Sequence, residues 1–446
     1  MHQHECNQEP IIDVGIIDRS QSATIRLEGA YATSAGDSAG LGEIRIDCRD
    51  GVLRCRGAVV LEGEQLEFTP DDFDTCRFSL EAMIGIEFHW QKTETEDFRG
   101  SLRLLAQPGD RVTVVNRVPL ETYITSVICS EMNANSSPES IKSHAVISRS
   151  WLLAQLDARD TQPSNRFQMS DSEIIRWTEC EAHAAFDVCA DDHCQRYQGI
   201  GRTDSPEVAA AIAETRGLVL TFDGRACDTR FSKCCGGVVE QYQTAWGDDS
   251  VPYLIALADG PDSQSPLPAL ADEATMRAFI EQPPTDAYCN CTDEAILNRV
   301  LNDYDRTTHD FFRWQVRLDA VRATELVSDK LDIDLGLILA MEPLERGPSG
   351  RLIRLRLTGE TASVVIGKEL EIRRALSESH LYSSAFIIDT EGTAERPDAF
   401  VLTGAGWGHG VGLCQIGAAV MACQGSNHQD ILRHYYPGTK IERFYA

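Results

Sequence analysis

The residue whose surroundings most clearly favour chemistry is Glu131. It follows Ile124 and Val127 at intervals of seven and four residues, which puts it on the apolar stripe of a predicted helix. A carboxyl group held against apolar surface loses hydration, so its pKa rises and it can stay protonated as a general acid. The C-terminal end of a helix acts in the same direction. The alternative is a structural glutamate balanced by a basic neighbour such as Lys142 or Arg149.

Soft metal ligands gather in one stretch of fifteen residues: Cys180, His183, Cys189, His193 and Cys194. His183, Cys189 and Cys194 supply three ligands that zinc accepts, with a fourth place for water, a carboxylate or another thiolate. Neighbouring aspartates could orient a histidine. The alternative is a surface loop whose cysteines pair or merely pack.

A third candidate is the glycine-dense loop of residues 404–412. Glycine at alternate positions lets the backbone approach a ligand closely or adopt positive φ. Trp407 offers a ring face of the kind on which sugars stack, and His409 offers a titratable group. The loop lacks the features of a phosphate-binding or dinucleotide-binding loop. It could equally be a structural crossover with Trp407 in the core. A cysteine nucleophile at Cys414, five residues after His409, is a weaker interpretation.

Two consecutive helices must position Glu131. Pro119 suits a first helical turn, and Glu121 suits the positive end of the first helix. Ser137 is the predicted N-cap of the second helix, which runs to about Asp157. Further helices are predicted at 368–376, from about 413 to 423 and after Asn427, and the preceding third of the chain consists of short strand-like runs.

These patterns predict an α+β fold, in which a β-rich N-terminal region precedes a mixed α/β core with a central cleft. We expect a β-rich region at 1–115 and a core at 116–260. This core contains the catalytic helix, which ends near Glu131, and the Cys- and His-rich stretch 158–204, called the Cys/His loop below. An inserted or accessory segment is expected at 261–350, and the C-terminal part of the core at 351–446.

The composition of the chain limits the classes of molecule that it can bind. The 446 residues carry a net charge of −28, which repels phosphate backbones and argues against nucleic acid. The sequence shows neither a transmembrane segment nor a signal peptide, although a leader could have been removed. The 15 cysteines do not define the compartment; Cys48 and Cys55 could form a disulfide across paired strands.

Two groups of motifs resemble the SpoIID/LytB family. The first comprises Val118-Pro119-Leu120-Glu121, Ser130-Glu131-Met132 and Pro138-Glu139-Ser140-Ile141-Lys142, with Arg149 following. The second comprises Gly406-Trp407-Gly408-His409-Gly410-Val411-Gly412 and Tyr435-Tyr436-Pro437-Gly438. Thr215-Arg216-Gly217 and Cys235-Gly236-Gly237 lie between them in the family's order.

The resemblance implies activity on bacterial peptidoglycan. It places Glu131 at the family's catalytic acid, and His183, Cys189 and Cys194 at the ligands of a zinc-bearing member. The sequence departs from the family at His144, where Gln is usual, and at Cys414, where Ser is frequent. Cysteine in place of serine suggests reduced thiols.

The resemblance implies a lytic transglycosylase that cuts the MurNAc–GlcNAc bonds of peptide-stripped glycan strands to 1,6-anhydro products. Lys142, Arg149, Trp407, His409 and Gln415 are the expected substrate-binding residues. Zinc would staple the Cys/His loop or act near the cleft. The alternatives are a non-catalytic glycan-binding enhancer of a cell-wall amidase, and a zinc hydrolase. The family implies a cell-envelope location, while the absence of a visible signal peptide leaves a cytoplasmic one open.

Overall fold

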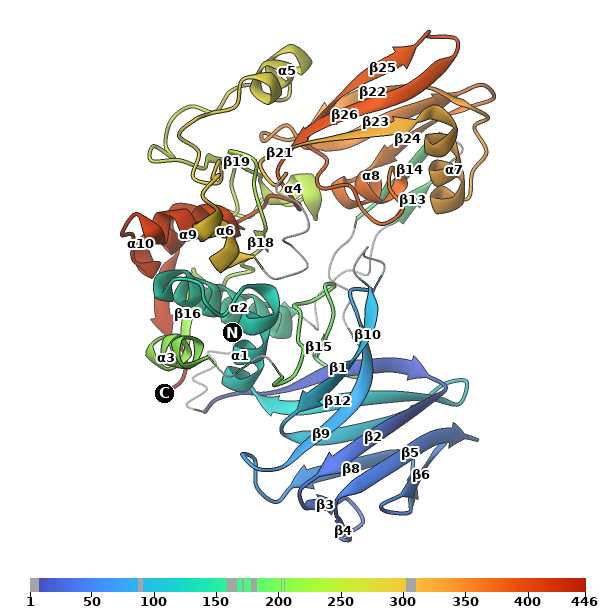
Figure 1. Cartoon of the computed structure of the whole chain (residues 1–446), viewed down its shortest axis with the longest axis vertical. Helices are drawn as coiled ribbons and strands as arrows, with labels where there is room; N and C mark the ends of the chain where they lie inside the picture. The colour runs from blue at the N-terminus through green and yellow to red at the C-terminus, as the bar shows by residue number, and fades with distance from the viewer. Residues whose placement is uncertain are drawn as a thin grey trace. The chain divides into compact units, whose positions relative to one another are not determined.

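The computed structural model describes residues 8–86, 91–158, 167–170, 172–177, 183–201, 203, 205–301 and 310–446. The chain divides into two compact units (Figure 1). Residues 1–160, 182–219 and 442–446 form the first, and residues 161–181 and 220–441 form the second. The predicted α+β class with a β-rich N-terminus is confirmed. The two units do not coincide with the four predicted segments, whose boundaries and central cleft stay predictions.

The first unit contains two mainly antiparallel sheets that pack through their apolar faces. Alternation produces those faces: in β2 (Ser22–Glu28), Ala23, Ile25 and Leu27 are buried while their neighbours are exposed. One sheet has the order β15-β1-β12-β11-β8-β3-β4 and the other β10-β9-β2-β5-β6-β7. Their remaining strands are β1 (Ile11–Ser20), β3 (Tyr31–Thr33), β4 (Ser38–Ala39), β5 (Gly42–Arg49), β6 (Val52–Gly57), β7 (Leu61–Gly63), β8 (Gln65–Pro70), β9 (Arg77–Ile84), β10 (Lys92–Phe98), β11 (Ser101–Gln107), β12 (Arg111–Pro119) and β15 (Val188–Cys189).

The disulfide considered between Cys48 and Cys55 is wrong. In the β5–β6 hairpin Cys48 lies opposite Leu53, and Cys55 lies opposite Ile46, so the two cysteines are not cross-strand partners. Both are buried free thiols, and burial raises the pKa of Cys55 to about 11. They serve as small core residues.

Three helices complete the first unit. Strand β12 leads directly into α1 (Leu120–Glu131), with Pro119 at the N-cap instead of inside the first turn. Helix α2 (Pro138–Ala158) begins as predicted, because Ser140 donates its N–H to the Ser137 Oγ. Helix α3 (Pro206–Glu214), capped by Ser205, packs against both and was not expected from the sequence.

The second unit is built around a five-stranded sheet, in the order β13-β14-β24-β23-β22, and a three-stranded sheet, β21-β26-β25. Helices α7 (Ala320–Leu331) and α8 (Glu369–Ala375) share one hydrophobic core with these sheets. The strands are β13 (Phe167–Met169), β14 (Glu173–Arg176), β21 (Arg313–Asp319), β22 (Ile338–Arg346), β23 (Leu352–Gly359), β24 (Ser363–Gly367), β25 (Phe386–Gly392) and β26 (Pro397–Ala405).

Short elements make up the rest of the described structure. Strand β27 (Leu413–Cys414) pairs in parallel with β18 (Phe231–Ser232), so the predicted helix at 413 begins two residues later, as α9 (Gln415–Cys423). The other elements are β16 (Leu218–Phe222), β17 (Arg225–Ala226), β19 (Val238–Val239), α4 (Tyr242–Ala245), β20 (Leu257–Ala258), α5 (Glu273–Glu281), α6 (Glu294–Val300), α10 (His428–Tyr435) and β28 (Lys440–Arg443). Among the described residues, no helix combines the length and apolarity needed to cross a bilayer.

Candidate functional site

Glu131 is the last residue of α1 and is nearly buried, with 9% of its surface exposed. Its Oε1 accepts a hydrogen bond from the backbone N–H of Arg196 at 3.0 Å. One residue before it, the Ser130 Oγ accepts the N–H of Gln198 at 3.2 Å and donates to the carbonyl of Ser126. The segment 196–198 is therefore bound along the end of α1 and fixes the Glu131 carboxylate.

Neither predicted basic neighbour contacts Glu131 in the described hydrogen bonds and ion pairs. The Arg149 side chain is fully buried and forms a bidentate pair with Glu121, at 3.1 and 2.7 Å. The same carboxylate accepts the N–H of Gly217 and the hydroxyl of Tyr445. Because its guanidinium is inaccessible, Arg149 holds the fold together and is not placed to bind substrate.

Lys142 also has other partners. Its Nζ lies 2.8 Å from Glu139 and 2.7 Å from Glu214, and these carboxylates raise its pKa. The Lys142 side chain is 15% exposed. Its proposed role in substrate binding stays a prediction.

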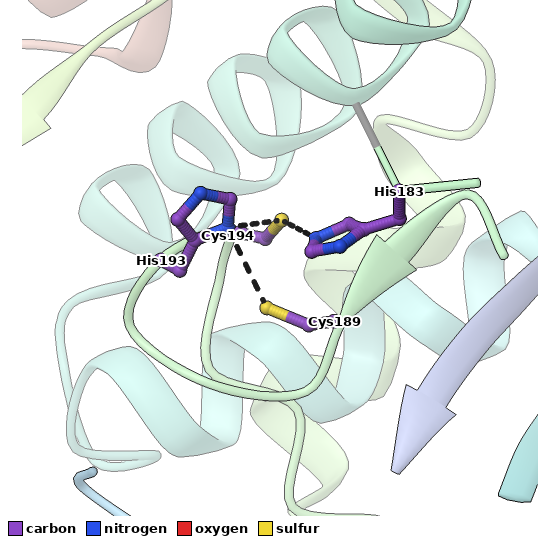
Figure 2. Close-up of side chains that lie close together, drawn as sticks. All are labelled: His183, Cys189, His193 and Cys194. Atoms are coloured by element: carbon purple, nitrogen blue, oxygen red, sulfur yellow. Dashed lines mark hydrogen bonds between the residues drawn. The ribbon is translucent and has the colours of Figure 1, made fainter. Parts of the chain in front are cut away.

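The Cys/His loop brings four ligand atoms together, as Figure 2 shows. The Cys194 Sγ lies 3.4 Å from the Nε2 of His183 and 3.5 Å from the Nδ1 of His193, and the Cys189 Sγ lies 3.8 Å from that Nδ1. All four atoms are within 4.8 Å of one another. His193 completes a set for which the sequence analysis left the fourth place open. Cys180 lies outside the described residues.

The sheet positions this loop. Strand β15 pairs in parallel with β1, placing Cys189 opposite Gly15. The ring of Phe186 packs over Gly15 so closely that a Cβ there would lie 2.6 Å from it. The Phe186 ring also lies against the ring of His183, tilted by 33° with the ring centroids 4.5 Å apart. Both carboxylate oxygens of Asp191 accept backbone N–H groups, those of Gly85 and Ile86. The ligands are thus tied to the first unit on several sides.

The donor set fits zinc. Two thiols and two imidazoles are the ligands of many structural zinc sites, and such sites take four protein ligands in a tetrahedron. Hydrogen bonding to Cys194, His183 and His193 keeps the pKa of Cys189 well below its usual range, which favours the thiolate that binds metal. Bound zinc would cross-link the loop; with four protein ligands, it would leave no open place for the water of a zinc hydrolase.

The glycine-dense loop closes around a buried arginine. Gly406, Gly408, Gly410 and Gly412 have positive φ, one of the two possibilities that the sequence offered for this loop, whereas Gly404 does not. A Cβ at Gly410 would lie 2.3 Å from the guanidinium carbon of Arg351. The same guanidinium donates a hydrogen bond to the carbonyl of Gly408. The glycines therefore let the loop backbone approach the Arg351 side chain of the protein itself.

Trp407 and His409 lie on this loop in different surroundings. Trp407 is partly exposed and packs between Phe311 and Tyr382, with ring centroids 4.9 and 4.6 Å away. His409 accepts the N–H of Val411 at its Nδ1. Burial, reinforced by nearby arginines, lowers the pKa of His409 well below its usual value, which favours the neutral imidazole.

Gln415 is buried, at 3% exposed, in the first turn of α9. It belongs to the second unit together with Trp407 and His409, whereas Glu131 belongs to the first. Their predicted shared role in substrate binding stays a prediction.

Comparison with known proteins bears on this arrangement. Residues 108–222, which include α1, α2 and the Cys/His loop, match the family model described as Stage II sporulation protein (SpoIID). The resemblance to the SpoIID/LytB family that the motifs indicated is confirmed over this part of the chain. Residues 240–412 also match a domain of unknown function, DUF8618.

The relatives that the chain matches are distant. Stage II sporulation protein D of Bacillus subtilis (strain 168) is 22% identical over 334 residues, covering 73% of this chain and 75% of that protein. Its counterpart in Bacillus amyloliquefaciens is 23% identical over 328 residues, with the same coverage. The amidase enhancer of Bacillus subtilis (strain 168) is 25% identical over 240 residues, covering 52% of this chain and 32% of that protein.

Proposed function

We propose that this protein is a lytic transglycosylase that cleaves the MurNAc–GlcNAc bonds of peptidoglycan strands, preferably strands without peptide stems. The observation that carries the proposal is the placement of Glu131. A carboxyl group at the end of a buried helix, held by a backbone N–H from the Cys/His loop, has the fixed position that proton transfer requires. Its position within the matched SpoIID domain supports the same role.

In the proposed reaction Glu131 donates its proton to the oxygen of the leaving GlcNAc, and an oxocarbenium-like state develops on MurNAc. The resulting carboxylate then takes the proton of the 6-hydroxyl of the same MurNAc. The oxygen of this 6-hydroxyl then bonds to the anomeric carbon of the same MurNAc and closes a 1,6-anhydro ring. No water is consumed and Glu131 ends protonated, so one carboxyl group can serve both steps.

The remaining roles are proposed from the sequence motifs. Lys142, on α2, is a candidate for binding the lactyl carboxylate of MurNAc. The exposed part of Trp407 is a candidate for stacking on a sugar ring. Zinc held by His183, Cys189, His193 and Cys194 would anchor the loop that carries the N–H bonded to Glu131. We place the protein in the cell envelope, where such a substrate occurs.

The experiment is product analysis by mass spectrometry after incubation with peptide-stripped and intact peptidoglycan. We expect anhydro-ended products from the stripped strands, and a loss of about 100- to 10,000-fold in Glu131→Gln. Glu81→Gln, at an exposed position of β9, is the matched control and should retain activity. Equal activity in wild type and Glu131→Gln would contradict the assignment of Glu131.

The second candidate is a non-catalytic enhancer that binds glycan and stimulates a cell-wall amidase. The similarity to the amidase enhancer over 240 residues favours it. An enhancer would raise the rate of a purified amidase without releasing products alone, and Glu131→Gln would enhance equally. Stimulation by both forms, without anhydro products, would replace the lytic proposal.

A further inference from the structure

A second group of ligand-type side chains lies in the second unit, apart from the Cys/His loop. It consists of Cys235, Asp259, Cys289 and Cys414, each no more than 2% exposed. They come from distant parts of the chain: Cys235 precedes a glycine pair, Asp259 directly follows β20, Cys289 lies before α6, and Cys414 caps α9. One donor atom from each lies within 4.8 Å of the other three.

The spacing of these donors corresponds to a single metal ion. Zinc–sulfur bonds of about 2.3 Å place two thiolates of a tetrahedron roughly 3.8 Å apart. The Sγ atoms of Cys235 and Cys289 are 3.5 Å apart, close to that edge and far beyond a disulfide bond. The cysteines of an iron–sulfur cluster bind separate irons and lie farther apart than one-ion ligands.

Two backbone N–H groups donate hydrogen bonds to the Cys414 Sγ, as backbone N–H groups do to metal-bound thiolates. Its Sγ accepts the N–H of Cys235 at 3.3 Å and that of Gly417 at 3.4 Å, at the positive end of α9. Gly417 is constrained as well, because a Cβ there would lie 2.8 Å from the Asp259 carboxylate. This end of the helix is shaped to bring a sulfur and a carboxylate together.

Asp259 is oriented by hydrogen bonds of its own. Its Oδ1 accepts the hydroxyl of Tyr435 at 2.6 Å, and its Oδ2 accepts the N–H of Cys289 at 3.1 Å. Carboxylates that bind metals are held in this way by outer partners. A carboxylate buried with several thiols is costly unless a cation compensates it. The nearby guanidiniums of Arg313 and Arg351 donate to the carbonyls of Gly236 and Cys235. The Nε2 of His434 lies 4.0 Å from the Asp259 Oδ1, which is longer than a hydrogen bond.

We propose that Cys235, Asp259, Cys289 and Cys414 form a second, structural zinc site. Three sulfur donors and one oxygen donor suit zinc, and four buried protein ligands leave no place for a reacting water. The site joins the segment that begins the Gly236-Gly237 turn to the end of the glycine-dense loop. It therefore fixes the base of the loop that carries Trp407 and His409, independently of any lytic activity.

Metal analysis of the full chain tests the site. We expect two zinc ions per chain in the wild type, one in Cys194→Ser, one in Cys289→Ser, and none in the double variant. Cys227→Ser, a buried cysteine outside both groups, should keep two. Wild-type zinc that falls to zero in Cys194→Ser alone, or stays at two in Cys289→Ser, would overturn the proposal.

Cobalt substitution covers the case in which the cysteine variant fails to fold. Cobalt-loaded Cys194→Ser, with only the second site intact, should show thiolate-to-cobalt charge transfer and strong tetrahedral d–d bands. Asp259→Asn in that background should shift the d–d bands and release cobalt more readily to a chelator. Absence of charge-transfer bands in folded, cobalt-treated Cys194→Ser would overturn the site. A disulfide between Cys235 and Cys289, found by mass spectrometry of unreduced protein, would do the same.

Discussion

The backbone N–H of Arg196 donates to the Oε1 of Glu131 at 3.0 Å, only two residues after Cys194. A ligand of the candidate metal centre is thereby joined by a short stretch of chain to the group that holds the candidate acid. The metal need not touch substrate to affect the reaction, because the loop that it cross-links carries the hydrogen-bond donor.

This connection predicts that metal loss reduces activity through the position of Glu131. Because displacement of a reacting group by about 1 Å can cost roughly 100-fold in rate, Cys194→Ser should lose about that much product release. Its zinc content should fall in parallel. Cys76→Ser, at a buried thiol outside both ligand groups, is the control. Full activity in Cys194→Ser after verified loss of zinc from this loop would contradict the connection.

The buried pair between Arg149 and Glu121 predicts a large loss of stability on truncation. Arg149→Met leaves the Glu121 carboxylate buried without its guanidinium, which costs about 3–5 kcal/mol in the free energy of unfolding. Lys142→Met removes partly exposed ion pairs and should cost at most about 1 kcal/mol. Urea denaturation measures both values. Equal losses in the two variants would argue against the structural role given to Arg149.

The close contact between Gly15 and the Phe186 ring predicts that the Cys/His loop packs tightly on the sheet. In Gly15→Ala the new methyl group meets the ring of Phe186, which also lies against the ring of His183. We expect a loss of about 1–3 kcal/mol in stability, as for other overpacked cores, together with weaker zinc binding in a chelator competition. Gly40→Ala, where a Cβ meets nothing within 4 Å, should change neither. Unaltered zinc affinity in Gly15→Ala would show that the ring does not position His183.

The sequence predicted those parts of the site that depend on local pattern. Helical periodicity placed Glu131 at the end of an apolar stripe, and Ser137 before Pro138 marked the next helix start. His183, Cys189 and Cys194 are close in the chain, so their spacing indicated a candidate metal centre, with a surface loop as the alternative. His193 was within the same stretch, but no spacing rule distinguished it from water or a carboxylate as fourth ligand.

Relationships between distant segments could not be predicted in the same way. Cys235, Asp259, Cys289 and Cys414 span 180 residues, and no local pattern indicates that the fold brings them together. The sequence offers Arg149, like Lys142, only as an alternative partner for Glu131. The bond of Arg149 to Glu121 depends on the side of α2 that faces the start of α1, which requires the tertiary packing.

The last prediction concerns His380, whose pKa burial lowers to about 3, with help from Arg373, Lys330 and Arg374. Below the usual histidine pKa of about 6.5, the His380 imidazole binds a proton in the unfolded chain but stays unprotonated in the folded chain. Stability should therefore be fully present above about pH 6.5 and fall as the pH drops toward 3, by up to about 1.4 kcal/mol per pH unit. In His380→Gln this contribution disappears, so the free energy of unfolding should fall less steeply between pH about 6.5 and 4.5. Identical slopes in wild type and variant would mean that His380 is protonated as easily in the folded chain as in the unfolded one.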